Sequence, residues 1–233
     1  MKGKLYGVGI GPGDPELLTL KALRVIRESK VIALPGKEPR ETVAYKIVEG
    51  AYPEIAEKEL LAVDMPMTKD PAKLEASHEA GAAAIMAYLD KGMDVAFPTL
   101  GDPTVYSTYL YIHRRVLSRG YGAEIIPGVP SFCAVAARLN QPLCEKAQRL
   151  MIVPASHGEV EDCLSVDANL VFMKAGRELG ALRDTLAAHG LLERASMVAN
   201  CGMEGETVCP RFADVPEGTG YFSVVLVKKG EPT

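Results

Sequence analysis

The first half of the chain alternates short apolar runs typical of β-strands with longer segments of helical periodicity. Residues 4–10 combine apolar residues with glycines, residues 16–29 carry apolar residues at helical spacing, and residues 31–34 again have strand character. Strands that alternate with helices form a parallel sheet covered by helices on both faces, and ligands bind such sheets at the carboxyl ends of the strands. This alternation predicts an α/β fold whose functional residues lie in the loops that follow the strands.

The remaining segments extend this pattern into a second domain. We expect helices over residues 41–49, 70–90, 104–118 and 131–139, and strands over residues 94–98 and 122–126. Further strands are expected over residues 150–154, 169–174, 195–200, 207–210 and 221–228. The last three have little helix between them, which favours antiparallel pairing. We therefore predict an N-terminal parallel α/β domain over residues 1–123 and a smaller α/β domain with a mixed sheet over residues 124–233.

Composition and charge exclude several classes of protein. Of the 233 residues, 48% are hydrophobic, but every apolar run is broken well before the roughly 20 residues that a membrane span needs. A formal charge of −4 provides no basic field for nucleic acid. The five cysteines are odd in number and lack a C-x-x-C pair, and the first residues lack the apolar core of a secretory signal. We therefore expect a cytoplasmic protein that holds no metal and binds neither membrane nor nucleic acid.

Residues 7–14, Gly-Val-Gly-Ile-Gly-Pro-Gly-Asp, form a glycine-rich loop between the first strand and the first helix. Backbone amides in such a loop can approach a ligand without obstruction by Cβ atoms. The dinucleotide-binding pattern G-x-G-x-x-G does not fit, because its third glycine falls on Asp14 or on Pro12. A tight turn in which Asp14 caps the next helix is the alternative interpretation.

Two more loops of this kind follow later strands. Residues 99–108, Thr-Leu-Gly-Asp-Pro-Thr-Val-Tyr-Ser-Thr, place a glycine, a carboxylate and several hydroxyls after one strand, and residues 127–132, Pro-Gly-Val-Pro-Ser-Phe, follow the next. Helix capping by Asp102, with Pro103 at the first helical position, is compatible with ligand binding by the same loop. Because the carboxyl ends of parallel strands share one edge, the three loops are expected to converge on one crevice.

The three loops, in this order, resemble those of the tetrapyrrole (corrin/porphyrin) methylase family, and the resemblance extends through the whole chain. Residues 66–68, Pro-Met-Thr, and residues 97–108 resemble the branch that methylates C20 of precorrin-2 or cobalt-factor II in cobalamin biosynthesis. The resemblance implies a two-domain homodimer. It also implies that S-adenosylmethionine binds in a cleft between the domains and that the tetrapyrrole enters over the N-terminal domain.

Carried over position by position, the resemblance implies a set of cofactor contacts. The contacts are Pro12, Leu100, Gly101, Asp102, Val105, Pro130 and Ser131, with Met173 and Gly202 from the second domain. Ser107 and Thr108 are close enough in sequence to Asp102 to join this set. Asp102 is expected to bind a polar group of the cofactor.

One departure from the family bears on the reaction. Uroporphyrinogen-III methyltransferases resemble this chain but place an aspartate, proposed to act as a base, where this chain has Pro35. Proline cannot transfer a proton, which weighs against the uroporphyrinogen reaction and leaves the catalytic residues unassigned. In-line alignment of the methyl group with an electron-rich ring carbon is expected to supply most of the rate advantage, and water or a modest base suffices for the later loss of a proton.

A tetrapyrrole carries many carboxylates, so cationic side chains near the loops are candidate substrate ligands. The candidates are Lys37, Arg40, Arg114, Arg115 and Lys174, with Arg177 as a similar case. For any single one of them an ordinary surface charge is the alternative interpretation, because basic residues are common on protein surfaces. His113 and His157 have no partner at metal-ligand spacing, which favours structural roles for both.

Two other functions stay open at this point. A different enzyme of the family, such as a precorrin-4 methylase or a diphthine synthase, shares the three loops, although residues 66–68 and 104–108 favour C20 methylation over both. A module that binds S-adenosylmethionine without catalysis is the alternative from another class. Methylation of a reduced tetrapyrrole separates the enzymes from the module.

Overall fold

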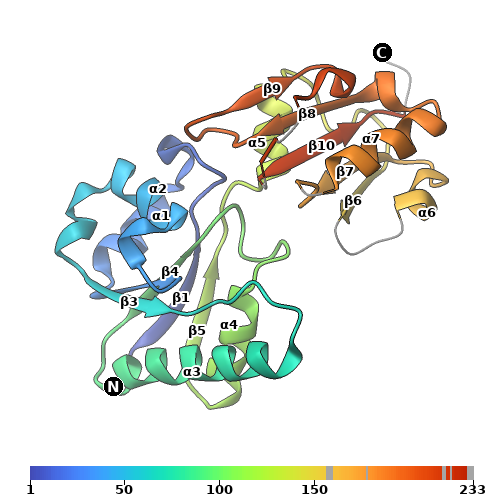
Figure 1. Cartoon of the computed structure of the whole chain (residues 1–233). Coiled ribbons are helices and arrows are strands. Elements are labelled where there is room, and N and C mark those ends of the chain that lie inside the picture. The colour runs from blue at the N-terminus through green and yellow to red at the C-terminus, as the bar shows by residue number, and fades with distance from the viewer. Residues whose placement is uncertain (156–159, 177, 217–218, 221, 230–233) are drawn as a thin grey trace. The chain divides into compact units, whose positions relative to one another are not determined.

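The computed structural model describes residues 1–155, 160–176, 178–216, 219–220 and 222–229. The chain divides into two compact units, Met1–Pro130 and Ser131–Thr233. The boundary lies later than the predicted one, because a division after Ala123 would cut through a strand of the first sheet. Figure 1 labels most helices and strands of both units.

The first unit contains a five-stranded sheet in which every neighbouring pair of strands is parallel. Its strands are β1 (Lys4–Gly9), β2 (Val31–Pro35), β3 (Glu59–Val63), β4 (Val95–Thr99) and β5 (Gly122–Ile126). Their order across the sheet is β3-β2-β4-β1-β5. The predicted parallel α/β fold is confirmed, although β3 was not predicted.

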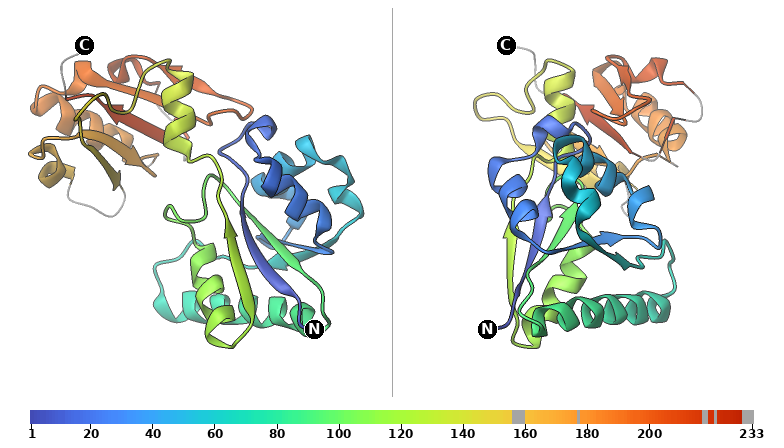
Figure 2. Two further views of the ribbon diagram at one scale, coloured as in Figure 1. Left: turned by 180° about the vertical axis from the view of Figure 1, so that it is seen from behind. Right: turned by 90° about the vertical axis from the view of Figure 1, so that its left-hand side faces the viewer.

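Helices cover both faces of this sheet, as Figure 2 shows. On one face α1 (Leu20–Glu28) and α2 (Val43–Ala51) bury Ile26 and Val48 against the strands. On the other face α3 (Pro71–Asp90) and α4 (Tyr109–Ser118) form the second half of the core. Short 3-10 helices occupy Pro15–Leu17, Pro39–Glu41 and Pro53–Glu57.

The order of the strands creates a switch point between β1 and β4. The chain leaves β1 towards α1 on one face and leaves β4 towards α4 on the other. Loops that depart in opposite directions from neighbouring parallel strands leave a crevice at the carboxyl ends, which is where such sheets bind ligands. The fold therefore places the glycine-rich loop and residues 99–108 at the expected ligand edge.

Two predicted helices begin several residues later than expected, and the first, predicted over residues 16–29, starts at Leu20. The helix predicted from residue 104 starts at Tyr109, and residues 100–108 form a loop instead. Asp102 therefore does not cap α4, and Thr108 at the cap position makes no capping hydrogen bond through its side chain. The polar residues of this loop are therefore not part of a helix and are available at the ligand edge.

The second unit has a mixed five-stranded sheet, as predicted. Its strands are β6 (Leu150–Pro154), β7 (Asn169–Met173), β8 (Ala195–Ala199), β9 (Thr207–Cys209) and β10 (Ser223–Val227), in the order β6-β7-β10-β8-β9. Only β6 and β7 pair in parallel among these described strands.

The helices of the second unit are α5 (Ser131–Arg138), α6 (Val160–Leu164) and α7 (Leu179–Ala188), with 3-10 helices at Leu192–Arg194 and Phe212–Asp214. Neither α6 nor α7 was predicted. Leu182 and Leu186 of α7 complete the core that Phe172 and Val225 begin, and α5 contacts β8 and β10. Among the described residues, no helix is both long and apolar enough to cross a membrane.

A glycine in β1 allows α4 to lie directly on the sheet. A Cβ atom on Gly7 would lie 2.0 Å from Cε1 of Tyr109. The Tyr109 ring is almost fully buried, tilts against Phe97, and its hydroxyl lies 2.8 Å from Nδ1 of His113. Because these contacts hold the Tyr109 ring, the ring cannot move away from an added methyl group. The absence of a side chain at Gly7 therefore allows α4 to pack at its observed position on the sheet.

We expect Gly7→Ala to lower the free energy of unfolding by about 2 kcal/mol through overpacking. Gly122→Ala on the neighbouring strand β5 is the matched control, because its Cβ would meet Lys4 at an ordinary 3.5 Å. That variant is expected to stay within about 0.5 kcal/mol of the wild type. Urea unfolding followed by circular dichroism checks both, and equal stabilities of the two variants would contradict the proposed contact.

Candidate active site

The three loops at the ligand edge pack against one another through glycines. The first loop follows β1, the second follows β4 and the third follows β5, and β1 lies between β4 and β5 in the sheet. A Cβ on Gly9 would lie 2.5 Å from the Gly128 nitrogen and 2.8 Å from the Gly101 oxygen, and a Cβ on Gly128 would lie 2.3 Å from that oxygen. Real Cβ atoms do not approach backbone this closely, so Gly9 and Gly128 are fixed as glycine by packing.

Backbone hydrogen bonds join the first two loops. The Gly101 nitrogen donates to the Gly11 oxygen at 2.8 Å, and the Ile10 nitrogen donates to the Thr99 oxygen at 3.1 Å. Gly11 and Gly101 both have positive φ angles, of 76° and 69°, which glycine adopts without strain. The two loops therefore form one continuous backbone surface at the switch point.

Asp102 ties the second loop to the third. One carboxylate oxygen accepts hydrogen bonds from the Thr104 amide, at 2.8 Å, and from the Thr104 hydroxyl, and the other accepts from the Gly128 amide at 3.0 Å. Burial raises the pKa of this carboxyl, but the hydrogen bonds from Thr104 and Gly128 together outweigh burial, so the pKa lies below its ordinary value. The carboxylate thus bonds the second loop to the third, and the expectation that it binds a polar group of the cofactor stays a prediction.

Thr99, the last residue of β4, carries an unpaired hydroxyl. Its Oγ1 is the one buried side-chain polar atom in the described part of the chain that lacks a hydrogen-bond partner. The β2–β4 pairing ends at Ile32 and Ala96, whereas the β1–β4 pairing runs on to Gly9 and Thr99. The unpaired hydroxyl of Thr99 therefore lies beyond the last β2–β4 pair, at the carboxyl end of β4.

The predicted cofactor residues of the first unit lie in these loops. Pro12 is buried in the first loop, and Leu100 packs partly against the α1 and α2 side of the core. In the second loop Val105 is half-buried, Ser107 accepts a hydrogen bond from the Tyr109 amide, and Thr108 is exposed. The half-buried Pro130 ends the third loop. The structure brings the loop that carries Leu100, Gly101 and Asp102 together with the first and third loops, as the pattern predicted.

The predicted residues of the second unit lie at the ends of its elements. Ser131 is the first residue of α5, and Met173 is the last of β7. Gly202, with a φ of 74°, follows β8, and its amide donates to Glu206 at 2.9 Å. Burial raises the pKa of Glu206, but the hydrogen bond from the Gly202 amide and the contact with Arg138 together lower it by more. The pKa of Glu206 therefore lies below its ordinary value. Glu206 was not predicted, and it fixes the loop that carries Gly202.

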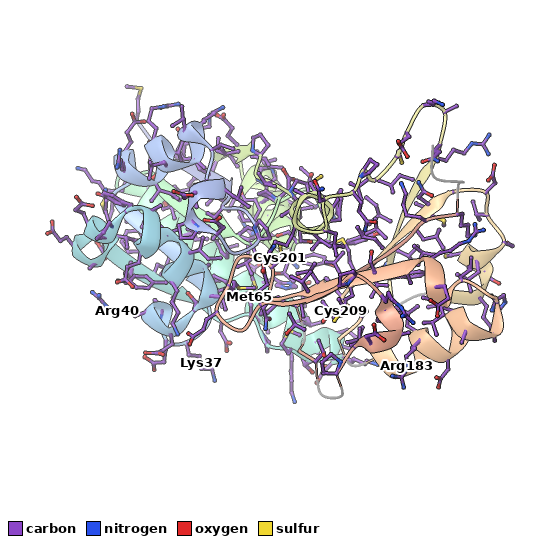
Figure 3. The ribbon with its side chains drawn as sticks, turned by 90° about the horizontal axis from the view of Figure 1, so that it is seen from above. Lys37, Arg40, Met65, Arg183, Cys201 and Cys209 are labelled. Carbon is purple, nitrogen blue, oxygen red and sulfur yellow. The ribbon has the colours of Figure 1, made fainter. Side chains whose placement is uncertain are left out.

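Two of the predicted substrate cations lie after β2 and are labelled in Figure 3. Lys37 is exposed, and its Nζ lies 3.9 Å from a carboxylate oxygen of Asp64. Arg40 donates to the Tyr45 hydroxyl at 3.1 Å and to the Ala56 oxygen at 2.9 Å. Lys37 is therefore loosely held near the ligand edge, whereas Arg40 braces the segment between β2 and α2.

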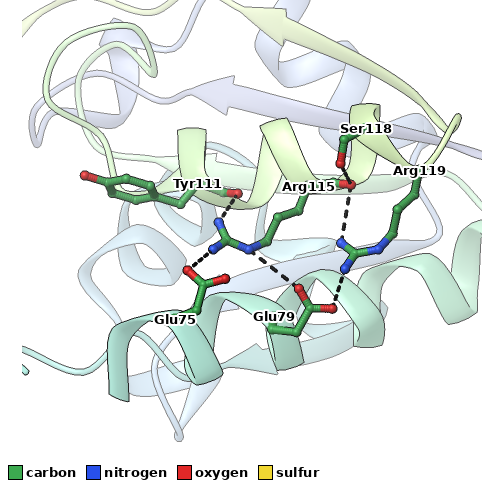
Figure 4. Close-up of polar contacts among 6 residues, drawn as sticks. All are labelled: Glu75, Glu79, Tyr111, Arg115, Ser118 and Arg119. Carbon is green, nitrogen blue, oxygen red and sulfur yellow. Dashed lines mark hydrogen bonds and ion pairs between the residues drawn. The ribbon is translucent and has the colours of Figure 1, made fainter. Parts of the chain in front are cut away.

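Arg115 belongs to an ion-pair network between α3 and α4 (Figure 4). Its guanidinium pairs with Glu75 and lies 3.7 Å from Glu79, and Arg119 pairs with Glu79 at 2.5 Å. The hydrogen bond and charge of Arg115 lower the pKa of Glu75. A substrate carboxylate would have to displace both glutamates. This engagement argues against the predicted substrate role of Arg115.

The other predicted cations and histidines have simpler surroundings. Arg114 is exposed in the C-terminal half of α4, which runs from the carboxyl edge of the sheet towards its amino edge. Lys174 follows β7 with a φ of 58°, and burial lowers its pKa. His113 pairs with Tyr109, which supports its structural role. Arg177 and His157 lie outside the described residues.

Sequence patterns missed Thr99 and the roles of Gly9 and Gly128. The signal for Gly9 and Gly128 was their position after neighbouring strands, but close packing of two glycines depends on the strand order. Thr99 ends a strand, and whether its hydroxyl has a partner depends on the fold around it.

Comparison with known proteins agrees with this geometry. A family model described as Tetrapyrrole (Corrin/Porphyrin) Methylases matches residues 4–214. The chain belongs to the tetrapyrrole methylase family, and it has the sheet order and ligand-edge loops described above.

Two relatives and one solved structure are similar to this chain over nearly its whole length. A cobalt-precorrin-2 C(20)-methyltransferase of Salmonella typhimurium is 34% identical, over 98% of both chains. A precorrin-2 C(20)-methyltransferase of Sinorhizobium sp is 33% identical over 97% of this chain and 95% of that protein. A uroporphyrin-III C-methyl transferase from Thermus thermophilus, solved in complex with S-adenyl homocysteine, has a TM-score of 0.70 at 23% identity over 97% of this chain and 98% of that chain.

Asp102→Asn is expected to lower the free energy of unfolding at neutral pH by about 2 kcal/mol, because one amide donor loses its acceptor. The folded pKa of Asp102 lies below its ordinary value of 3.8, so its stabilisation is complete above that pH and declines as the pH falls through the folded pKa. The difference from the wild type should therefore shrink in acid. Urea titrations at several pH values check this.

Asp14→Asn is the control for this variant. The Asp14 side chain accepts one hydrogen bond, from the Glu16 amide at 2.8 Å, and asparagine caps such turns as well as aspartate does. An equal loss of stability in both variants would contradict the bridging role of Asp102.

Thr99→Val is expected to leave the stability of the ligand-free protein unchanged or to raise it by about 1 kcal/mol, because it removes a buried hydroxyl without a partner and keeps the branched shape. Thr99→Ser, which keeps the hydroxyl and removes the methyl group, is expected to lower it by about 1 kcal/mol. Thermal unfolding of both variants checks this. A destabilised Thr99→Val would show that the hydroxyl has a partner.

Proposed function

We propose that this protein transfers a methyl group from S-adenosylmethionine to C20 of precorrin-2 or of cobalt-factor II in cobalamin biosynthesis. The observation that carries the proposal is the similarity to the Salmonella C(20)-methyltransferase, which spans 98% of both chains. A match of that length includes the loops at the ligand edge and both units. The branch of the pathway, with or without cobalt in the ring, is the finer question.

The residues at the ligand edge fit the methyl donor. Gly9, Gly101 and Gly128 bring three stretches of backbone close together without side chains between them. S-adenosylmethionine, when bound, supplies an activated methyl group. We propose that Pro12, Leu100, Gly101, Val105 and Pro130 form its surroundings in the first unit. Ser107, Thr108, Ser131, Met173 and Gly202 stay predictions for the same ligand.

The chain's own contribution is to position the acceptor carbon. Asp102 and the glycines hold the loops in one arrangement, so the loops themselves need little further ordering when the reactants bind. Pro35, the last residue of β2, has no ionisable group, and no general base is assigned. A reduced meso carbon is electron-rich, so alignment provides most of the acceleration and water can remove the proton.

The substrate's carboxylates need donors at this edge. Lys37 is the cation best placed among the predicted ones, because it follows β2 and its pairing with Asp64 is long. Lys174 and Arg114 stay predictions for the same role. The cytoplasmic location and the homodimer also stay predictions.

Anaerobic incubation with labelled S-adenosylmethionine tests the function. Precorrin-2 and cobalt-factor II are supplied in parallel, and the pigment is analysed by mass spectrometry. Gain of one methyl group on either pigment supports the proposal and identifies the branch. No methyl gain on either, with S-adenosylhomocysteine still bound by the protein, would reject C20 methylation in favour of another reaction of the family.

Gly101→Ala is expected to weaken S-adenosylhomocysteine binding by about 10-fold, because alanine is strained at a φ of 69° and the loop must shift. Gly120→Ala is the matched control, since Gly120 also has a positive φ, of 77°, but no atom lies within 4 Å of its Cβ position. Isothermal titration calorimetry checks both. Equal affinity of the two variants would remove Gly101 from the cofactor site.

A further inference from the structure

The loop between β4 and α4 holds an aromatic residue in an unfavourable backbone conformation. Tyr106 has a φ of 50°, in the left-handed region that glycine and asparagine tolerate and bulky residues avoid. The other described non-glycine residues with positive φ are Asn140, Lys146, Lys174 and Asn200. Tyr106 is the aromatic one in this set.

Hydrogen bonds on both sides impose this conformation. Before Tyr106, the Val105 amide donates to the backbone oxygen of Asp102 at 3.1 Å, and the Asp102 carboxylate accepts a hydrogen bond from the Thr104 amide. After it, the Ser107 hydroxyl accepts from the Tyr109 amide at 3.2 Å. The residue is thus held between two fixed turns. Such strain persists only where the surroundings enforce it, and it collects at functional sites.

The Tyr106 side chain does not offset the backbone strain by packing in the hydrophobic core. Tyr106 is 43% exposed, whereas Tyr109, only a short way along the chain, is 1% exposed. The loop extends beyond the end of the sheet at the carboxyl edge, as Figures 1 and 2 show. The fold therefore presents a large flat ring, on a rigid loop, at the edge where the ligand binds.

We propose that Tyr106 is a specificity-determining residue whose ring packs on a face of the tetrapyrrole substrate, an inference that rests on the proposed function. The macrocycle has broad conjugated faces, and aromatic rings pack well on such surfaces in offset or tilted geometry. The hydrogen-bonded backbone fixes the direction in which the side chain leaves the loop, so binding has to order only the side-chain torsions. The contact favours a flat, ring-shaped acceptor over a small or flexible one.

The proposal separates substrate binding from stability. Asparagine tolerates the left-handed conformation and lacks the ring, so Tyr106→Asn relieves the strain and removes the proposed contact together. Tyr106→Phe keeps both the ring and the strain. We expect Tyr106→Asn to raise the unfolding temperature of the ligand-free protein by roughly 3 °C and to raise the KM for the tetrapyrrole by about 10-fold.

The test measures KM for the pigment methylated by the wild type, the Kd for S-adenosylhomocysteine, and the unfolding temperature. Tyr106→Phe should keep the KM within about 2-fold of the wild type, and all three proteins should bind S-adenosylhomocysteine equally. An unchanged KM in Tyr106→Asn would overturn the proposal while the methylation reaction stands. Weaker S-adenosylhomocysteine binding in that variant would overturn it by assigning the ring to the cofactor. A wild type that methylates neither pigment would overturn the proposed function, and this inference with it.

Discussion

The arrangement of the ligand edge depends on the Asp102 carboxylate. It is buried, which opposes its ionisation, yet hydrogen bonds from Thr104 and Gly128 favour the charged form and prevail. A charged, fully bonded carboxylate is more restrictive than a neutral one, because both oxygens require donors in fixed places. These hydrogen bonds therefore fix the loop after β5 relative to the loop after β4. The glycines add to this restriction by allowing backbone to lie against backbone, where any side chain would separate the loops.

Rigidity in these loops explains how a strained residue can exist beside them. Loops generally relax towards favourable backbone angles, but the second loop is bonded on either side of Tyr106 and cannot. The first and third loops reach their conformations through glycine, without strain. One edge of the sheet thus combines a relaxed glycine surface with an exposed aromatic residue whose backbone has a positive φ. The two features suit different ligands, a folded cofactor that needs close backbone and a flat macrocycle that needs an apolar face.

Sequence patterns predicted the elements that follow from local periodicity and failed where tertiary contacts decide. The alternation of strands and helices predicted the parallel sheet, and the strand run after residue 195 predicted the mixed one. β3 was missed because it is a half-exposed edge strand, Glu-Leu-Leu-Ala-Val, without a distinct period. The helix expected from residue 104 begins at Tyr109, because Asp102 bonds to Thr104 and Gly128 in a turn that periodicity does not reveal. The substrate role expected of Arg115 overlooked its partners, which lie on a helix distant in sequence.

Charge pairing limits how this chain can recognise an acidic ring. Several cations of the first unit are already neutralised: Glu75 and Glu79 pair with Arg115 and Arg119, and Glu124 pairs with Lys4 and Lys21. The whole chain carries a formal charge of −4, so long-range attraction of a polycarboxylate is weak. Recognition must then come from short-range contacts, which are hydrogen bonds, a few local cations such as Lys37, and shape. A rigid aromatic surface at the ligand edge discriminates by shape without depending on net charge, and this is the kind of selectivity that the strained loop is built to provide.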